Sequence, residues 1–381
     1  MSALRRLVAR IAPSPVRELV RRNRRRRWER RRPPGPAPGE LRAVVYLPTW
    51  ARWDRMRQRP QYLVQAFAAA GHPAYFVDPR EPAPRLVDGV RIVPDLRHVP
   101  RRGVVLYVHY APIRELFDAF DDPVVVYDLH DDLSIYDPDE VDLPPHRRVA
   151  AHHAAVVREA DVVLVSHEVL AERHRHEAPD LLVVENGVDV VAFSSPRPRP
   201  GDLPDAAPIV GYHGAISYWF DVELVTETAR RRPEWTFVLV GPLVEPYDHE
   251  ALERLSRLPN VHLLGERPSD EIPAYVRCFD VGLVPFRLDR MTEAVSPLKM
   301  YEYLAAGVPV VATPLPAARA TPGVRAASGP AFVDAVDEAL AVGRRPEFAA
   351  EAAEVAARAD WGRRIEPVLA RLDDLDLRRV R

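Results

Sequence analysis

Short apolar runs alternate with helical stretches along most of this 381-residue chain, and this alternation constrains the fold more than any other feature. Valine-rich runs such as 43–47, 104–108 and 124–127 have the length of buried strands, and an amphipathic stretch lies at 60–70. Strands that alternate with helices form parallel sheets with helices on both faces. The sequence therefore predicts an α/β fold with doubly wound parallel sheets.

A proline cluster at 196–208 interrupts the alternation, which begins again with the apolar run 209–212. A chain of this length exceeds what one hydrophobic core usually holds, so we expect two domains of similar size. In the second half we expect a helix at 269–278 that Ser269 caps, and another at 297–306. The predicted parts are a basic tail and proline-rich linker (1–40), an N-terminal domain (41–195), a C-terminal domain (196–350) and a final helical segment (351–381).

The net charge of the whole chain is only −2, and it gives no field that would attract nucleic acid. The first 32 residues differ, because they carry thirteen arginines and apolar residues at helical spacing. Such a segment could lie on an anionic membrane surface, or it could be a basic tail without fixed structure. Nucleic-acid binding is a weaker alternative, because Trp28 is the only aromatic side chain among these charges.

The single cysteine, Cys278, excludes an internal disulfide and a cysteine metal cluster, which suits a reducing compartment. No run of about 18 apolar residues is present, as a membrane-spanning helix would require. The arginine-rich start also lacks the apolar core of a secretory signal. We therefore expect a cytoplasmic protein, which the basic tail could hold at the inner face of the cell membrane.

Lys299 is the only lysine in the chain, and it stands in the segment SPLKMYEYLAAGVPVVATP, which begins at Ser296. Pro297 suits the first turn of a helix and Gly307 suits its end. Lys299 would then lie where amides and the helix dipole favour an anion, with Glu302 one turn deeper on the same face. This pair suits the phosphates and ribose of a nucleoside diphosphate. The alternative is a surface ion pair between the two side chains.

This segment resembles the donor-binding helix of GT-B glycosyltransferases, particularly the large retaining family 4 (group 1) and its near relatives. Further stretches match in the expected order: ENGVD at 185–189, GYHGAI at 211–216, WTFVLVGP at 235–242 and NVHLLG at 260–265. The resemblance runs from about residue 43 to the end. It implies a GT-B fold, in which two Rossmann-like domains face a central cleft and a C-terminal helix crosses back to the first domain.

In the family, the glutamate that matches Glu302 binds the ribose, and the lysine that matches Lys299 approaches the phosphates. Many relatives have a second glutamate eight positions earlier, where this chain has Ala294 with Glu293 beside it, so retention of the anomeric configuration stays open. Glycines of the 211–216 loop would let the backbone approach the diphosphate, although a plain tight turn is the alternative. The predicted donor-binding residues are Ser296, Pro297, Leu298, Lys299, Glu302, Gly211, His213, Gly214, Ala215 and Ile216.

On the predicted acceptor side, the strand at 124–127 leads into the sequence DLHDD at 128–132. Residues beyond the C-terminal end of a parallel strand face the ligand crevice. His130, Asp131 and Asp132 are therefore candidate bases for the acceptor hydroxyl, and Asp131 is favoured. An aspartate-rich loop that caps the next helix is the alternative, and a metal site is conceivable. The resemblance implies no metal or other cofactor, since GT-B enzymes generally need none.

The loop at 49–61 contains an RPQ sequence, and related enzymes use this loop near the acceptor. Arg57 and Arg59 could neutralise an acidic or pyrophosphate-bearing acceptor, or Arg59 could only pair with a carboxylate that closes the two domains. His152 and His153 are expected on an exposed helix face. The predicted acceptor-side residues are Arg57, Arg59, Gln61, Ser166 and Asn186.

The predicted function is sugar transfer from a UDP- or GDP-linked donor to a glycan or lipid-linked acceptor, in polysaccharide or cell-envelope biosynthesis. No nucleic-acid partner is expected. Two alternatives stay open: a nucleotide-sugar epimerase of the same fold, and a catalytically silent partner protein. The presence of both Lys299 and Glu302 argues against the silent protein.

Overall fold

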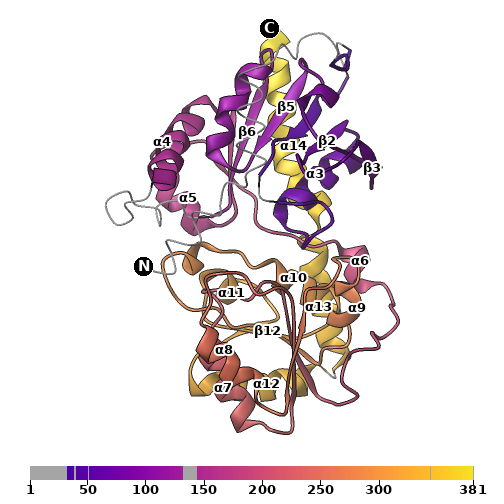
Figure 1. Ribbon diagram of the computed structural model, residues 1–381, viewed down its shortest axis with the longest axis vertical. Helices are drawn as coiled ribbons and strands as arrows, with labels where there is room; N and C mark the ends of the chain where they lie inside the picture. The colour runs from indigo at the N-terminus through magenta and orange to yellow at the C-terminus, as the bar shows by residue number, and fades with distance from the viewer. Residues whose placement is uncertain (1–31, 38–39, 50, 132–143, 344, 381) are drawn as a thin grey trace. The chain divides into compact units, whose positions relative to one another are not determined.

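The computed structural model describes residues 32–37, 40–49, 51–131, 144–343 and 345–380. The chain divides into two compact units, which are described separately (Figure 1). The N-terminal unit extends to Glu185 and includes the chain again from Arg364, and the C-terminal unit is Asn186–Arg363. The division therefore falls ten residues before the proline cluster. That cluster belongs to the C-terminal unit, where Arg277 Nη1 donates to the Ser194 carbonyl at 2.9 Å just before it.

The N-terminal unit contains an eight-stranded sheet within the described residues, in the order β3–β4–β2–β1–β5–β6–β7–β8. Neighbouring strands are parallel except β3 and β4, which form a hairpin. Near-continuous valine and leucine suit strands buried on both faces. The strands are β1 (Ala43–Tyr46), β2 (Ala74–Val77), β3 (Arg85–Val87), β4 (Val90–Val93), β5 (Val104–Val108), β6 (Val124–Leu129), β7 (Val162–Val165) and β8 (Leu182–Val183).

Helices cover this sheet in the manner of a doubly wound fold. Helix α3 (Arg59–Ala69) packs against β1 and β2, α4 (Pro144–Glu159) against β6, and α5 (Glu168–His174) against β7 and β8. The 3-10 helices η2 (Leu96–His98) and η3 (Ala111–Ala119) lie on either side of β5 in the chain.

The last helix, α14 (Trp361–Val380), belongs to the N-terminal unit from Arg364 onward. Figure 1 shows it in yellow beside the strands of that unit. Arg42 Nε donates to Asp376 Oδ1 at 2.7 Å, and Arg364 pairs with Glu185 at 2.9 Å. The predicted C-terminal helix that returns to the first domain is thus present.

The C-terminal unit contains a six-stranded, fully parallel sheet in the order β11–β10–β9–β12–β13–β14. This is the Rossmann strand order, and ligands of such sheets bind at the carboxyl ends of the strands where the order reverses, here at β9 and β12. The strands are β9 (Ile209–His213), β10 (Thr236–Val240), β11 (Val261–Gly265), β12 (Val281–Val284), β13 (Val310–Ala312) and β14 (Val324–Ala326).

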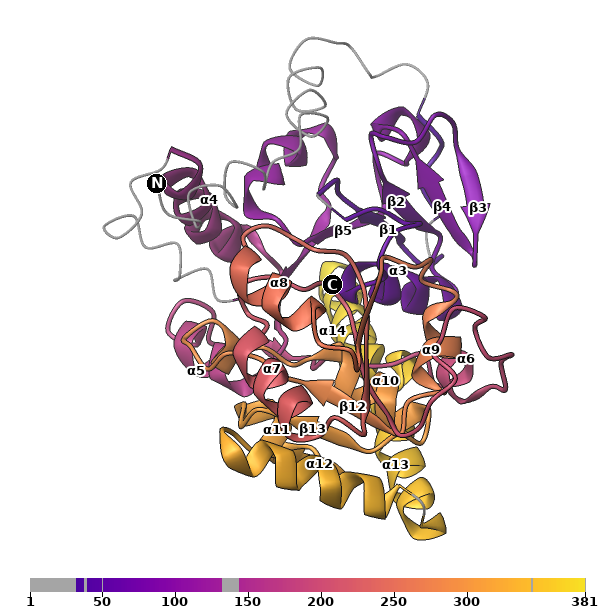
Figure 2. The ribbon, with the colours of Figure 1, turned by 60° about the horizontal axis from the view of Figure 1, so that its bottom comes forward.

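Two groups of helices pack on this sheet. One group contains α7, α8 and α12, and Figure 2 shows α12 running along β13. The other contains α6, α9, α10 and α13, with α10 against β12 and β13. The helices are α6 (Val190–Ser194), α7 (Val222–Arg231), α8 (His249–Ser256), α9 (Ile272–Val276), η5 (Thr292–Ala294), α10 (Leu298–Ala305), α11 (Pro316–Ala320), α12 (Pro330–Val342) and α13 (Pro346–Arg358).

Two local predictions need correction, and one feature was missed. The helix expected at 269–278 begins only at Ile272, with Glu271 rather than Ser269 before it, because Pro273 fits only the first turn of a helix. Strand β6 continues past 127 to Leu129, so Asp128 is a strand residue. The β3–β4 hairpin was not predicted, although its Asp88-Gly89 turn, with positive φ at both residues, suits a two-residue hairpin.

Candidate functional site

Helix α10 forms as the sequence pattern predicts. Pro297 is its N-cap residue, the helix begins at Leu298, and Gly307 follows its end with a φ of +73°. Met300, Tyr303 and Leu304 are fully buried, which anchors the helix on the sheet. Lys299 is therefore the second helical residue, at the end where the first amides have no acceptor within the helix.

Lys299 is half-buried and lies over two aromatic rings. Its Nζ is 4.8 Å from the centre of the Phe286 ring and 5.4 Å from that of Tyr212. Burial lowers the pKa of Lys299 from 10.5 to about 8, and nearby Glu302 offsets only part of this. Among the described residues Lys299 has no ion-pair or hydrogen-bond partner. A cation held in this way is available for an anionic ligand.

Glu302 is buried and pairs with His213, at 3.1 Å between Oε2 and Nε2. The His213 ring meets the edge of Tyr303, whose hydroxyl accepts from the His213 amide at 3.1 Å. The alternative of a surface ion pair between Lys299 and Glu302 is therefore wrong, because the carboxylate lies inside the unit with a different partner. The His213–Glu302 pair joins the end of β9 to α10.

The backbone that follows β9 lies directly against Lys299. A Cβ atom on Gly214, where φ is +119°, would be 3.1 Å from Lys299 Cε. A Cβ atom on Gly241, where φ is +151°, would be 2.0 Å from the Gly214 carbonyl oxygen. Both positions therefore require glycine, and they bring two backbone turns together beside the lysine.

The other predicted donor residues divide into three groups. Pro297 and Leu298 begin α10, and Ala215 and Ile216 form the turn after Gly214, where the Ile216 amide donates to Pro242 at 3.0 Å. Ser296 is buried, and its Oγ has no hydrogen-bond partner among the described residues. Gly211 is inside β9, where a Cβ would meet the Phe279 ring at 2.2 Å. Gly211 therefore serves packing rather than close approach to a ligand.

Asn186 was predicted on the acceptor side. Asn186 is the first residue of the C-terminal unit, and its Nδ2 donates to the Ser296 carbonyl at 2.5 Å. The residue thus supports the segment that leads into α10. The match of ENGVD at 185–189 gave no reason to connect Asn186 with position 296.

In the N-terminal unit, Asp128 is at the centre of a buried polar cluster. Arg59 Nε donates to both Asp128 oxygens, at 3.0 and 2.8 Å, and the Tyr107 hydroxyl also donates to Oδ2. Burial alone would raise the pKa of Asp128, but the Arg59 guanidinium and His109 hold it well below its usual range. Arg59 therefore pairs with a carboxylate inside its own unit, and its side chain is only 2% exposed.

His130 and Asp131 lie at the edge of this cluster. His130 stacks on His109 with 3.7 Å between ring centroids, and its Nε2 is 2.8 Å from Asp131 Oδ2. Burial and the His130 imidazole lower the pKa of His109 to about 4, so His109 is neutral at pH 7. Ser166 Oγ donates to the His130 carbonyl at 2.9 Å and fixes this turn. The third candidate base, Asp132, is outside the described residues.

His109 was missed in the sequence, although it directly follows β5 just as His130 follows β6. Arg57 pairs with Asp88 at 2.8 Å and also donates to Gln65, so it is near the β3–β4 turn. Gln61 is buried. Its side-chain oxygen accepts a hydrogen bond from the Gln58 amide, and its side-chain nitrogen donates one to the Arg52 carbonyl. The buried Gln61 side chain therefore shapes the loop before α3 instead of facing an acceptor.

Comparison with known proteins finds similarity to glycosyltransferases. Residues 207–342 match the family described as glycosyl transferases group 1. A 136-residue segment is 40% identical to the putative teichuronic acid biosynthesis glycosyltransferase TuaH of Bacillus subtilis (strain 168). The match covers 35% of this chain and 34% of the relative, so the chain spans about a third of the length of the curated relative that it matches.

The whole chain resembles solved glycosyltransferase structures. Sucrose-phosphate synthase from Thermosynechococcus elongatus superposes with a TM-score of 0.64 at 16% identity, over 88% of this chain and 99% of that one. WaaG, a glycosyltransferase involved in lipopolysaccharide biosynthesis, gives 0.60 at 15% identity, over 86% and 98%. At this identity the likeness shows the fold alone, and it confirms the predicted GT-B fold.

Proposed function

We propose that this chain is a glycosyltransferase, which transfers a sugar from a nucleoside diphosphate to an acceptor hydroxyl. The match of residues 207–342 to the glycosyl transferases group 1 family supports this class of enzyme, and these residues include both Lys299 and Glu302. The proposal depends most on one observation. The only lysine of the chain has its ammonium beside the Gly214 turn, at a helix N-terminus, with no ion pair or hydrogen bond among the described residues.

We assign the nucleoside diphosphate to the C-terminal unit. Lys299 and the first amides of α10 would bind the phosphates, where negative charge grows as the sugar leaves. The Gly214 and Gly241 turns would allow the diphosphate to approach the backbone. Glu302 would accept the ribose hydroxyls, and His213 holds this carboxylate in place.

We assign the acceptor to the N-terminal unit, with Asp131 or His130 as the base. Partial desolvation would raise the pKa of Asp131, but the His130 imidazole outweighs it and the pKa is lowered. Asp131 is therefore ionised at neutral pH and can accept a proton, or it can hold His130 in the orientation to do so. In either arrangement Ser166 and His109 position the pair. The Asp131–His130 pair needs no bound metal in this proposal.

The name of the relative supports one class of acceptor. TuaH is named for teichuronic acid biosynthesis, which favours a glycan acceptor of the cell envelope for this chain too. The sequence at 1–32 favours a lipid-linked acceptor at an anionic membrane surface. No helix in the described part of the chain is both long and apolar enough to cross a membrane.

Calorimetric titration of UDP and GDP into the protein tests the donor site. Wild type should bind one of the two nucleotides at micromolar concentration, and Lys299→Ala should weaken that binding at least tenfold, about 1.4 kcal/mol. Arg290→Ala is a matched control, since it removes an exposed cation from the same unit. If a well-folded wild type bound neither nucleotide, the proposed donor would be wrong.

Two alternatives predict different products. An epimerase of the same fold would release a changed nucleotide sugar without any acceptor. A catalytically silent protein would bind nucleotide and leave the donor sugar intact with every acceptor. Incubation with radiolabelled donor, with and without membrane lipid extract, separates these cases, because only a transferase moves label into an acceptor and depends on that extract.

A further inference from the structure

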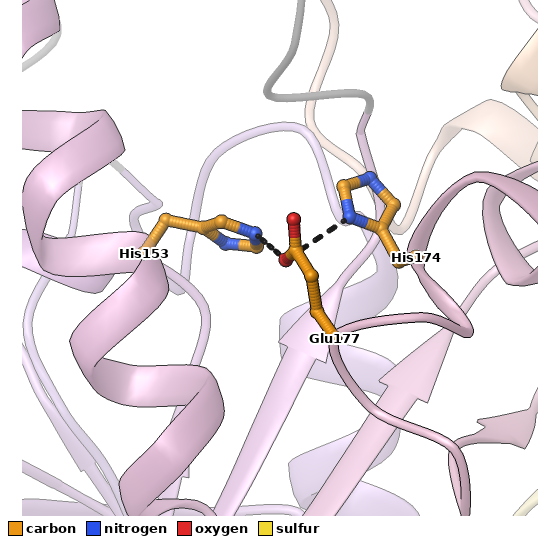
Figure 3. A group of neighbouring side chains, drawn as sticks. All are labelled: His153, His174 and Glu177. Atoms are coloured by element: carbon orange, nitrogen blue, oxygen red, sulfur yellow. Dashed lines mark hydrogen bonds and ion pairs between the residues drawn. The ribbon is translucent and has the colours of Figure 1, made fainter.

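Two histidines and a glutamate meet in the N-terminal unit, away from the Asp128 cluster (Figure 3). His153 is on α4, His174 is the last residue of α5, and Glu177 follows one turn later. One ligand atom from each of the three lies within 4.8 Å of the others. We propose that His153, His174 and Glu177 bind a divalent transition-metal ion, with Zn²⁺ as the best candidate.

The distances suit such an ion. His153 Nε2 is 3.1 Å and His174 Nδ1 is 3.6 Å from the same glutamate oxygen, Oε2. Around a tetrahedral zinc with bonds of about 2.0–2.2 Å, ligand atoms are separated by roughly 3.3–3.6 Å. Figure 3 shows the carboxylate between the two rings, so small shifts would open a position equidistant from the three ligand atoms.

Burial of the imidazoles argues for a ligand. His153 and His174 are each only 7% exposed, which contradicts the expectation that His153 is on an exposed helix face. Neither ring nitrogen of His174 has a hydrogen-bond partner among the described residues. A buried ring nitrogen without a partner is unfavourable, and a bound metal would remove this penalty at Nδ1.

Tyr127 supplies the support that a metal-binding histidine usually has. Its hydroxyl lies 2.9 Å from His153 Nδ1. With a metal at Nε2, Nδ1 must carry the proton and donate it to the tyrosine oxygen, which fixes both tautomer and ring orientation. Two imidazoles and one carboxylate also match the donor set of zinc better than that of magnesium or calcium, which prefer oxygen alone. Water would complete the coordination.

The metal would join α4 to α5, and Tyr127 would connect this site to β6 in the N-terminal unit. Tyr127 is in β6, His153 in α4, and His174 with Glu177 at the end of α5. Tyr127 and Asp128 are neighbours in a strand, so their side chains point to opposite faces of the sheet. The ion would therefore hold α4 and α5 on the face of the sheet opposite the Asp128 cluster. Tyr127, which supports the ion, is three residues before His130. This is a structural role, and it leaves the metal-free chemistry proposed for the donor unchanged.

Titration of the full chain with Co²⁺ and Zn²⁺, after removal of metal with a chelator, tests the site. Wild type should take up one Co²⁺ per chain with the intense visible absorption of a tetrahedral site, and Zn²⁺ should displace it. His174→Gln should abolish this spectrum, and Glu177→Gln, at a partly exposed position, should weaken binding at least tenfold. Tyr127→Phe should weaken binding about tenfold, since it removes only the supporting hydroxyl.

The matched control is His249→Gln, which removes the exposed histidine of another His–Glu pair, with 2.8 Å to Glu245. This variant should bind Co²⁺ as wild type does. Circular dichroism reports whether each variant is folded, and two independent ligand variants protect the test against one that does not fold. The proposal is overturned if folded wild type binds no metal at micromolar concentration, or if both ligand variants bind as tightly as wild type.

Discussion

Lys299 combines two properties that are coupled through its proton. Its ammonium is the proposed phosphate ligand, and its pKa is lowered to about 8 because the half-buried side chain is partly removed from water. Free protein therefore loses this charge as the pH rises through 8, and a bound phosphate would raise the pKa again. Affinity for nucleotide depends on the charged form, so it should fall on the alkaline side.

We predict that the Kd of the bound nucleotide is constant from pH 6.5 to 7.5 and rises toward tenfold per pH unit above about 8. Calorimetry at pH 8 in two buffers of different ionisation enthalpy should show uptake of about half a proton. Lys299→Arg keeps its charge across this range and should show no such dependence. Equal proton uptake by wild type and the arginine variant would contradict the assignment to Lys299.

Asp128 should stabilise the fold rather than take part in chemistry. Asp128→Asn leaves the Arg59 charge buried with a weaker partner, and we expect a loss of about 3–5 kcal/mol in the free energy of unfolding at pH 7. Because the folded pKa of Asp128 is below its unfolded value, its contribution is present above about pH 4 and is lost as the pH falls further.

Urea unfolding followed by circular dichroism measures this contribution. The difference between wild type and Asp128→Asn should shrink as the pH is lowered below about 4. Asp121→Asn is the control, since Asp121 pairs with Arg101 and Arg102 nearer the surface, where solvent screens the charges, and its stability should stay close to that of wild type. A similar small loss for both variants would show that the buried pair is not a major source of stability.

At the scale of elements, the turns after β9 and β10 depend on each other. Gly241→Ala would place a Cβ atom against the Gly214 carbonyl oxygen, and backbone cannot yield there as a flexible side chain would. We predict at least a tenfold loss of nucleotide affinity and a lower thermal midpoint. Gly329→Ala also has positive φ, +55°, but its Cβ would meet nothing within 4 Å. It should lose only about 1–3 kcal/mol to strain, with unchanged affinity.

The sequence could predict the features that depend on residues close together in the chain. Strands and helices followed from valine runs and amphipathic spacing, and α10 was placed to within a residue because Pro297 and Gly307 mark its ends. The Lys299–Glu302 segment could be recognised because its residues are contiguous. Gly211 was misread because its constraint, the Phe279 ring, is 68 positions away in the chain and only the folded sheet brings them together.

The same limit explains the N-terminal unit. The sequence placed His130 and Asp131 after a strand, but it could not show that Arg59 and Asp128 would pair in the interior. His153 was misread because its neighbours on α4 alternate between exposed and buried, and its partners come from α5. Such contacts depend on how separate elements pack, which local patterns do not encode.

For the whole molecule, Arg32 marks where the chain joins the folded N-terminal unit. Its guanidinium donates to the carbonyls of Val99, Pro100 and Ala119, and it stacks on Phe120 at 4.6 Å. The predicted linker is therefore attached to the N-terminal unit at its first described residue. The basic sequence before Arg32 is outside the described residues, and its proposed role at an anionic membrane can be separated from the fold by truncation.

We predict that deletion of residues 1–31, which keeps Arg32 and its contacts, abolishes binding to vesicles that contain phosphatidylglycerol. Each arginine near such a surface contributes about 1 kcal/mol, so wild type should bind, and less tightly at high salt. Nucleotide affinity and thermal midpoint should be unchanged, because Lys299 and its neighbours are all in the C-terminal unit. Equal vesicle binding by both forms would place the membrane contact elsewhere, whereas a lower thermal midpoint would show that the tail is part of the fold.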